Sequence, residues 1–449
     1  MDRSRWIHAI NRFGFGATAV ELDSWSGKTF RDYVQFQKSE PLQFDLSYYE
    51  DFDVDELKSV DKKEMRRKLA STMNKISSEW IHLMISSPYG LHEKLNLFWH
   101  DHFACEIKNP LLARNFTNTI REHAMGNFRD LLIGVSKSGG MIDYLNLKQN
   151  RKGKPNENFA RELCELFTLG QGNIYTEQDI KEIARAFTGW SRRTKGGFHF
   201  RKRLHDRGQK NILGRKGKFT GEDVIDLILE HKDCARFICG KIYKTFINPA
   251  RDEPRINEMT DVFYSSDYSI RALIEYIGER DWFYNDSNKM TIIKSPIEFI
   301  VSMGRQFNIK CDKTASWTQY QRLFNQILFR PPSVAGWKKD KEWINSNSLA
   351  LRLRTPSIVL TGGDVEVYAR PDYDSNPMDD SRRMTGRLFK GITGDWSFFR
   401  KMNPDIDEVT LFFNDKLSRQ SSALLQENID RSDDYKTLLL MSIPEYQLT

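Results

Sequence analysis

The 449-residue chain has few cysteines and no long hydrophobic run. Its five cysteines are irregularly spaced and include no Cys-x-x-Cys pair, which excludes a zinc ribbon and a disulfide framework and fits a reducing compartment. No stretch approaches the roughly 18 apolar residues of a membrane helix. The first residues also lack the apolar core of a signal peptide. The sequence therefore predicts no membrane span and a cytoplasmic location.

The composition is that of a globular protein. Hydrophobic residues make up 39% and charged residues 29%, which is too apolar for general disorder. The net charge of +7 is a mild excess for this length and only suggests anionic partners. There is no internal repeat, and no helix-turn-helix, zinc-finger or phosphate-loop motif, so a dedicated nucleic-acid-binding module is disfavoured.

The spacing of apolar residues predicts a mainly α fold with a multi-helical globular body. Helices are expected at 5–12, 28–38, 63–86, from 91 onward, 112–135, 156–169, 177–188, 222–231, 233–247, 268–278, 295–305, 317–328 and 343–354. Residues 191–219 are glycine-rich and basic, which predicts a small basic β-hairpin or long ordered loop inserted in this body. We divide the chain into a main helical domain over 1–355, a linker over 356–383 and a small helical C-terminal extension over 384–449.

The segment 155–167 combines an apolar face with dense polar chemistry. Asn156 is expected to cap the helix. At 100° per residue the polar face carries Glu157, Asn158, Arg161, Glu162 and Glu165. Arg161 lies four residues from both Glu157 and Glu165 and can pair with either, which leaves Glu162 free. The segment is either a solvated helix with ordinary ion pairs or a carboxylate cluster that transfers protons or binds a metal.

Two histidines flank Asp101. On a regular helix they point to nearly opposite sides, so His102 joins the apolar stripe while His100 faces outward with Asn96. His102 is then a hydrogen-bonded core histidine, or it acts with Glu106, one turn on, and with Glu162 as a base or as ligands of a divalent metal. Both interpretations are left open.

The helix expected at 177–188 begins with a capping box formed by Thr176 and Asp179, and Arg185 lies away from its buried stripe. The basic segment that follows carries Arg192, Arg193, Lys195, Arg201, Lys202, Arg203, Arg207, Lys210, Arg215, Lys216 and Lys218. Its only acid is Asp206. His205, Asp206 and Lys210 offer a base, a carboxylate and an anion-binding amine within six residues. The segment is either a solvated loop or a surface that binds phosphate, sulfate, an acidic protein or nucleic acid.

Several of these strings resemble the signature of the domain of unknown function 1800 family. The central matches are 156–163 (NENFAREL), 165–170 (ELFTLG) and 184–190 (ARAFTGW), with Cys164 standing where an aliphatic residue or Met is expected. Flanking matches are 98–103 (FWHDHF), 149–153 (QNRKG), 205–210 (HDRGQK), 294–296 (KSP), 334–337 (VAGW) and 343–345 (WIN). Together they cover roughly residues 5–355. The resemblance implies a bacterial origin, a largely helical body and a functional link to exported proteins of a sulfatase-like family. It supplies no reaction and no catalytic residues.

Three functions follow as hypotheses, and whether the protein is an enzyme stays open. The first is a hydrolase-type enzyme for an anionic or polyhydroxyl substrate, with a divalent metal as a possible cofactor. Its acid–base or metal chemistry would come from Glu157, Glu162, Glu165 and His102, and its substrate contacts from Asn158, Arg161, Arg185, His205, Asp206 and Lys210. The second is a non-catalytic binding or assembly protein that docks an acidic partner through residues 192–218. The third is nucleic-acid binding through the same segment.

Overall fold

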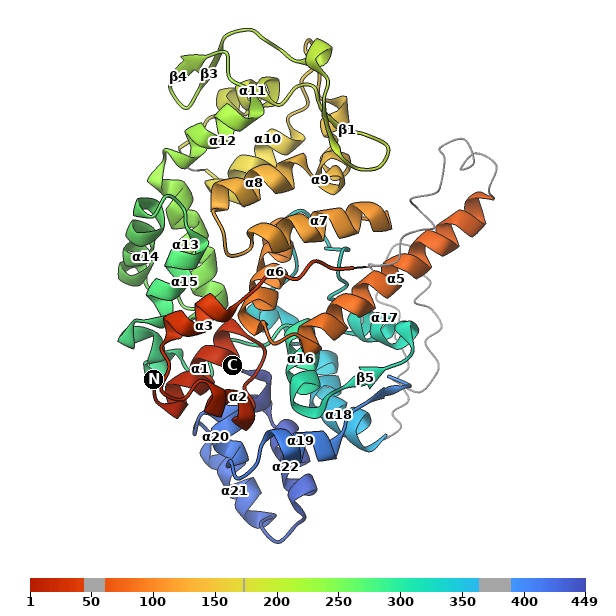
Figure 1. Ribbon diagram of the computed structural model, residues 1–449, viewed down its shortest axis with the longest axis vertical. Coiled ribbons are helices and arrows are strands. Elements are labelled where there is room, and N and C mark those ends of the chain that lie inside the picture. The colour runs from red at the N-terminus through yellow and green to blue at the C-terminus, as the bar shows by residue number, and fades with distance from the viewer. Residues whose placement is uncertain (44–60, 173, 363–388) are drawn as a thin grey trace.

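The computed structural model describes residues 1–43, 61–172, 174–362 and 389–449, which fold into a mainly helical body (Figure 1). These residues contain 21 α-helices and three two-stranded antiparallel sheets. The prediction of a mainly α fold is confirmed. None of the helices in these ranges has the length and apolar character needed to cross a membrane.

The first part of the chain forms helices only: α1 (Arg3–Phe13), α2 (Ala19–Ser24), α3 (Phe30–Phe36), α5 (Lys62–Ser86), α6 (Gly90–His102), α7 (Pro110–His123), α8 (Phe128–Lys137) and α9 (Gly139–Tyr144). The middle contains α10 (Asn158–Glu162), a π-helical turn (Leu163–Thr168), α11 (Glu177–Ala186), β1 (Trp190–Arg192), β2 (Phe198–Phe200), β3 (Lys210–Ile212), β4 (Arg215–Gly217), α12 (Gly221–Leu229), α13 (Lys232–Phe246), α14 (Glu253–Ser265) and α15 (Ile270–Gly278). The last part contains α16 (Pro296–Phe307), β5 (Lys310–Cys311), α17 (Thr314–Leu323), α18 (Ser346–Thr361), β6 (Ile392–Thr393), α19 (Trp396–Met402), α20 (Glu408–Phe413), α21 (Arg419–Glu427) and α22 (Asp433–Met441).

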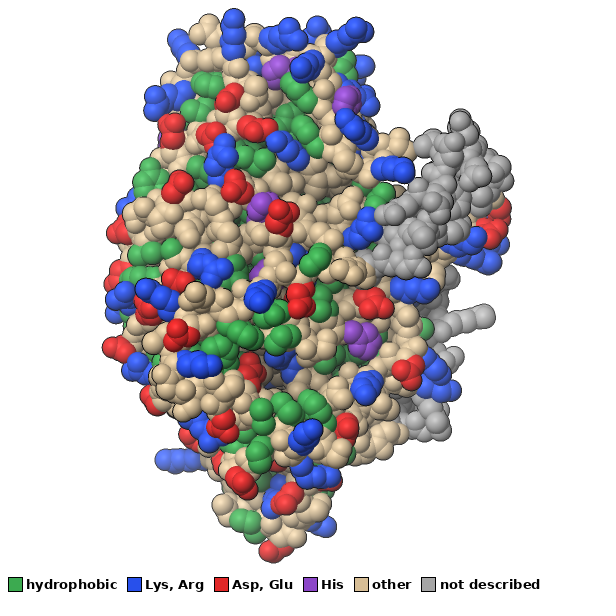
Figure 2. Space-filling model, in the orientation of Figure 1, with side chains coloured by type: hydrophobic (Ala, Val, Ile, Leu, Met, Phe, Trp, Pro, Cys, Tyr) green, Lys and Arg blue, Asp and Glu red, His purple; other side chains and the backbone are tan. Residues whose placement is uncertain are grey.

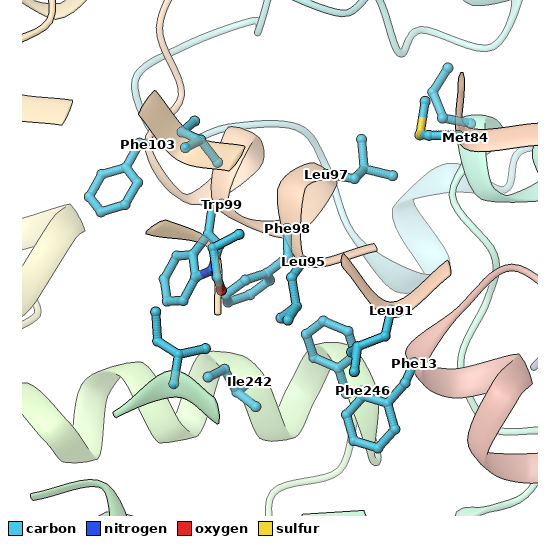
Figure 3. Close-up of a cluster of buried hydrophobic side chains, with 14 of the residues drawn as sticks. Phe13, Met84, Leu91, Leu95, Leu97, Phe98, Trp99, Phe103, Ile242 and Phe246 are labelled. Carbon is cyan, nitrogen blue, oxygen red and sulfur yellow. The ribbon is translucent and has the colours of Figure 1, made fainter. Parts of the chain in front are cut away.

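Helix α6 lies at the centre of the molecule and is buried on every side. Twelve of its 13 residues are buried. Its apolar side chains pack against α13 through Ile242 and Phe246 and against α1 through Phe13 (Figure 3). A helix that is buried all round must also find partners for its polar side chains.

The polar side chains of α6 are paired inside the protein. Glu93 forms a buried ion pair with Arg121 of α7, with one Nη–Oε distance of 2.9 Å. His100 accepts a hydrogen bond from the backbone N–H of Phe329 at 3.2 Å. The prediction that His100 faces outward with Asn96 is wrong, because both residues are fully buried.

The predicted hairpin or loop over 191–219 forms two hairpins. Strand β1 pairs with β2, and β3 pairs with β4. The hairpins lie at the upper end of the molecule with α10, α11 and α12 (Figure 1). Strand β2 is the segment Phe198–Phe200, in which two Phe flank His199.

Several predicted boundaries differ from the observed ones. The helix expected at 112–135 is two helices, α7 and α8, because Asn127 caps a new helix by accepting the N–H of Arg129 at 2.8 Å. The periodic pattern missed α2, α9 and α14. The linker predicted from 356 begins inside α18, which continues to Thr361, and residues 363–383 lie outside the described ranges.

The helices after residue 389 do not form a core of their own. Their apolar side chains belong to the same hydrophobic cluster as the rest of the protein. The last residues pair with the segment before α16: Lys294 donates its N–H to the carbonyl of Gln447 at 2.8 Å, and the Gln447 side chain accepts from Arg352 at the same distance. This arrangement places the C-terminal segment beside the start of α16.

Candidate functional site

Arg161 forms ion pairs with two of the three carboxylates that the sequence suggested as catalytic. It contacts Glu157 at 3.4 Å and Glu165 at 3.3 Å, and it binds Glu177 through two bonds of 2.7 and 2.8 Å. The strongest of these contacts, to Glu177 of α11, was not predicted because it joins two helices. These are partly exposed ion pairs of the kind that contributes little free energy.

Glu162 differs from its neighbours. It is half-buried and forms neither a hydrogen bond nor an ion pair with any residue in the described ranges. Burial, and then the charge of Glu165, raise the pKa of Glu162. Burial raises the pKa of the half-buried Tyr144, and the charges of Glu106 and Glu162 raise it further. The adjacent Asn158 is exposed.

His102 is a sealed core residue. Its Nε2 donates to the carbonyl of Phe167 at 3.1 Å, and its Nδ1 accepts from Lys241 at 3.1 Å. Lys241 also donates to the carbonyl of Leu166 at 2.8 Å. Residues 163–168 form a π-helical turn, not the regular helix predicted at 156–169. In this turn the carbonyls of Leu166 and Phe167 face α13 and α6. Burial lowers the pKa of His102 and lowers that of Lys241 to about 7.

The metal set proposed from the sequence does not assemble. Helix α6 ends at His102, so Glu106 is not one helical turn away, and it pairs with Lys108 at 3.1 Å. Both ring nitrogens of His102 are already bonded. Among the residues whose positions are described, no three His, Cys, Asp or Glu side chains are grouped so that they could hold a metal ion.

His205, Asp206 and Lys210, which the sequence suggested as substrate contacts, form hydrogen bonds that hold a loop together. The Lys210 ammonium is buried and donates to the backbone carbonyls of Asp206 at 2.7 Å and Gly208 at 3.2 Å. Asp206 binds Arg185 through bonds of 2.8 and 3.2 Å. Nδ1 of the buried His205 lies 3.0 Å from the Thr188 carbonyl, and burial lowers its pKa.

A pocket of about 710 Å³, open to solvent, lies elsewhere, between α6, α13, the start of α16 and the segment 337–343. We call it the lysine-lined pocket. Its walls carry three aromatic side chains, four lysines and three carboxylates: Phe98, Trp337, Trp343, Lys94, Lys244, Lys338, Lys339, Asp101, Glu298 and Asp340. Four of the flanking family-like strings, at 98–103, 294–296, 334–337 and 343–345, meet here.

One wall of the pocket is a buried ion pair. Lys94 of α6 lies 2.5 Å from Glu298 of α16, with side-chain exposures of 5% and 14%. Glu298 also accepts the N–H of Ser295 at 2.6 Å in the capping box of α16. Burial opposes the charged form, but Lys94 and Ser295 together keep the pKa of Glu298 below its usual range. Glu298 is therefore a poor proton acceptor near neutral pH.

The same ion pair lines a second, narrower pocket of about 430 Å³, on which Lys294 also lies. The Lys294 ammonium donates to the Tyr446 carbonyl at 2.9 Å. Burial, and then the charges of Arg352 and Lys94, lower its pKa to about 7.

Asp101 organises the opposite wall. One carboxylate oxygen accepts the N–H of Trp337 at 2.9 Å and the other contacts Lys339 at 2.6 Å. Gly336 has a φ of +87°, and a Cβ atom there would lie 2.3 Å from the Asp101 carboxylate. Only glycine fits this position. In the sequence, Asp101 stands out only as the residue between two histidines. The signal that could have identified it was its place in one of several family-like strings.

The structure thus defines a helical protein with a solvent-open pocket lined by lysines and aromatic side chains. The family described as Protein of unknown function (DUF1800) matches residues 8–448, and the chain belongs to this family. The match extends beyond residue 355 and so includes the C-terminal helices. No curated protein and no solved structure matches the chain. Since the family description assigns no activity, a function must be argued from the site.

Proposed function

We propose that the protein binds a small organic anion in the lysine-lined pocket. The observation that carries this proposal is the pairing pattern of the four lysines. Lys94 and Lys339 are neutralised by Glu298 and Asp101. Lys244 and Lys338 are exposed and have no carboxylate partner in the described part of the chain. Asp340 offsets part of their charge, so the pocket keeps a surplus of one positive charge.

The aromatic side chains of the pocket indicate that the ligand also carries an apolar ring. Trp337 and Trp343 are 5% and 9% exposed, and each lines the pocket. Apolar walls with a few placed charges are typical of small-molecule sites. An aromatic carboxylate, sulfate or phosphate ester fits this combination, because its ring packs on the tryptophans while its anionic group reaches Lys244 and Lys338.

Binding is tested with matched charged and neutral ligands. We expect phenyl phosphate, phenyl sulfate or indole-3-acetate to raise the free energy of unfolding, by about 2.7 kcal/mol at a hundredfold excess over Kd. The neutral analogues phenol and indole-3-acetamide should have a much smaller effect. The Lys244→Met/Lys338→Met double variant should bind the anion at least about tenfold more weakly, because each lost contact to a charged group is worth about 1.5 kcal/mol or more. The measurement is thermal unfolding with and without ligand, and titration of tryptophan fluorescence.

Lys401→Met provides the control, because Lys401 is an exposed lysine on α19, outside the pocket. This variant should bind like the unmodified protein. Equal binding of the charged and neutral ligands, or unchanged binding by the double variant, would contradict the proposal.

A second candidate is the hydrolase-type activity, now centred on Glu162 alone. It is supported by a half-buried carboxyl group that has no partner among the described residues and whose raised pKa suits a general acid or base.

Glu162→Gln tests this candidate. The variant should fold normally but lose hydrolysis of nitrophenyl esters or phosphate esters by about a hundredfold or more, the usual contribution of a general acid or base. Glu157→Gln, which removes only an ion pair with Arg161, should keep its activity. If the two variants behave alike, Glu162 has no catalytic role.

A further inference from the structure

The upper end of the molecule brings together two basic segments that are far apart in the sequence. Lys152 donates its backbone N–H to the carbonyl of Leu204 at 2.8 Å, and Gly189 donates to the carbonyl of Asn150 at 3.0 Å. The turn at 151–154 therefore lies against residues 201–204. Figure 2 shows Lys and Arg side chains gathered along this end, over the hairpins of Figure 1.

Six cations on these segments make up what we call the basic end: Arg151, Lys152, Arg201, Lys202, Arg203 and Arg207. All six are exposed, and no carboxylate partner is found for any of them within the described ranges. Three other basic residues nearby are paired or buried. Arg192 binds Asp143 at 2.6 Å, Arg215 binds Glu230 at 3.1 Å and Lys210 is buried. Lys154, Arg193, Lys216 and Lys218 are also exposed and have no carboxylate partner in the described ranges. The basic end is the group of uncompensated cations that the contact between residues 151–154 and 201–204 brings together.

Hydrogen bonds from buried and half-buried side chains fix the backbone conformation of the basic end. The buried Lys210 fixes the carbonyls of residues 206 and 208, and Arg185 fixes the Asp206 carboxylate. Gly189 has a φ of +84°, and a Cβ atom there would lie 2.8 Å from the Arg201 carbonyl. The residues that the sequence suggested as substrate contacts therefore support the loop that presents the cations. A surface ordered in advance loses less conformational entropy on binding.

We infer that the basic end is a docking surface for an acidic protein. This goes beyond ligand binding in the pocket and does not depend on it. Four of the six cations are arginines, whose planar guanidinium groups bind carboxylates through two parallel hydrogen bonds. Phe198 and Phe200 do not offer the stacking faces typical of single-strand binding, because they pack on Trp190 and His205. None of the six cations lies on an α-helix that could enter a DNA groove: Lys202 and Arg203 lie on the 3-10 turn Lys202–Leu204, and the other four lie on turns and loops.

Binding is measured by fluorescence anisotropy with a labelled peptide of alternating Glu and Ser residues as the probe. We expect saturable binding that weakens as salt is raised. Arg201→Glu/Arg203→Glu should weaken binding at least tenfold while the thermal unfolding curve stays unchanged. The matched control is Lys401→Glu/Arg419→Glu, which reverses two exposed cations on α19 and α21 at the opposite end of the molecule (Figure 1). This control should bind like the unmodified protein.

A charge-preserving variant separates carboxylate recognition from general attraction of polyanions. Arg201→Lys/Arg203→Lys keeps both charges but removes the guanidinium forks, so we expect binding to weaken several-fold. Unchanged binding by this variant would overturn the proposal. Two other results would also overturn it: tighter binding of a DNA duplex of equal charge, or tighter binding of phosphatidylserine vesicles, each at physiological salt.

Discussion

Arg121→Met is expected to lower the free energy of unfolding by about 3–5 kcal/mol, the usual cost of removing one partner of a buried ion pair. Arg121 and Glu93 are each 1% exposed, and the guanidinium binds both carboxylate oxygens. Methionine fills a similar volume but leaves the Glu93 charge inside the core without a partner. The effect is measured as the shift in the urea unfolding curve, with the m-value as a check on two-state behaviour.

A double-mutant cycle separates the interaction energy of the Glu93–Arg121 pair from the cost of burying one charge alone. Glu93→Leu/Arg121→Met removes both charges and should recover much of the lost stability, because two apolar side chains leave no uncompensated charge. Arg215→Met removes one partner of an exposed pair and should cost less than about 1 kcal/mol. A loss below 1 kcal/mol for Arg121→Met would mean that water reaches Glu93.

Local signals in the sequence were sufficient for long amphipathic helices. The pattern over 63–86 predicted α5 to within one residue, since a 25-residue helix with one apolar stripe has no internal break. The capping box at Thr176 and Asp179 is present at the start of α11 as predicted. These features depend on residues within a few turns of one another.

Helix α6 shows where such signals fail. Its Glu93, Lys94 and His100 look like ordinary solvated residues in the sequence, yet all three are buried. Their partners Arg121, Glu298 and Phe329 lie on distant segments. No helical periodicity can distinguish an exposed carboxylate from one that is paired across the core.

The lysine-lined pocket, like the ion pairs of α6, is formed by segments that are far apart in the sequence. The family-like strings at 98–103, 294–296 and 334–337 were recognised individually, but their spacing along the chain carries no information about convergence. The polar helix at 156–165 drew attention because its charges are adjacent in sequence. Its charges pair largely with one another and with Glu177, whereas the pocket is built from residues that only the fold brings together.

The second large effect that we expect is a loss of stability in mild acid, caused mainly by the four most deeply buried histidines: His8, His92, His100 and His102. Burial is the main cause that lowers all four pKa values, to about 4 for His92 and about 3 for His100. In the unfolded chain a histidine has a pKa near 6.5. Below that pH the unfolded state binds protons that the folded state does not, so stability falls as the pH falls from about 6.5 toward the folded-state values.

Each histidine contributes a loss of up to about 1.4 kcal/mol per pH unit in this window. Glu408, whose pKa burial raises to about 6, and Glu21, whose pKa burial also raises, take up protons in the folded state and offset part of the loss. We therefore expect a net decline of about 3 kcal/mol per pH unit between pH 6 and 5, measured by urea unfolding at a series of pH values. Since natural domains have about 5–15 kcal/mol of stability, much of it should be gone by about pH 4.5.

The assignment to buried histidines is tested with a residue that keeps the hydrogen bonds but does not titrate. In His92→Gln the side-chain amide can still donate to the Arg121 carbonyl, which His92 Nε2 contacts at 2.9 Å. The variant should therefore lose about a quarter of the histidine contribution to the pH slope while its stability near pH 7.5 changes much less. His199→Gln, at an exposed position of β2, should leave the slope unchanged. A stability that stays constant between pH 7 and 5, or an equal change of slope in both variants, would show that the buried imidazoles take up protons without unfolding the protein.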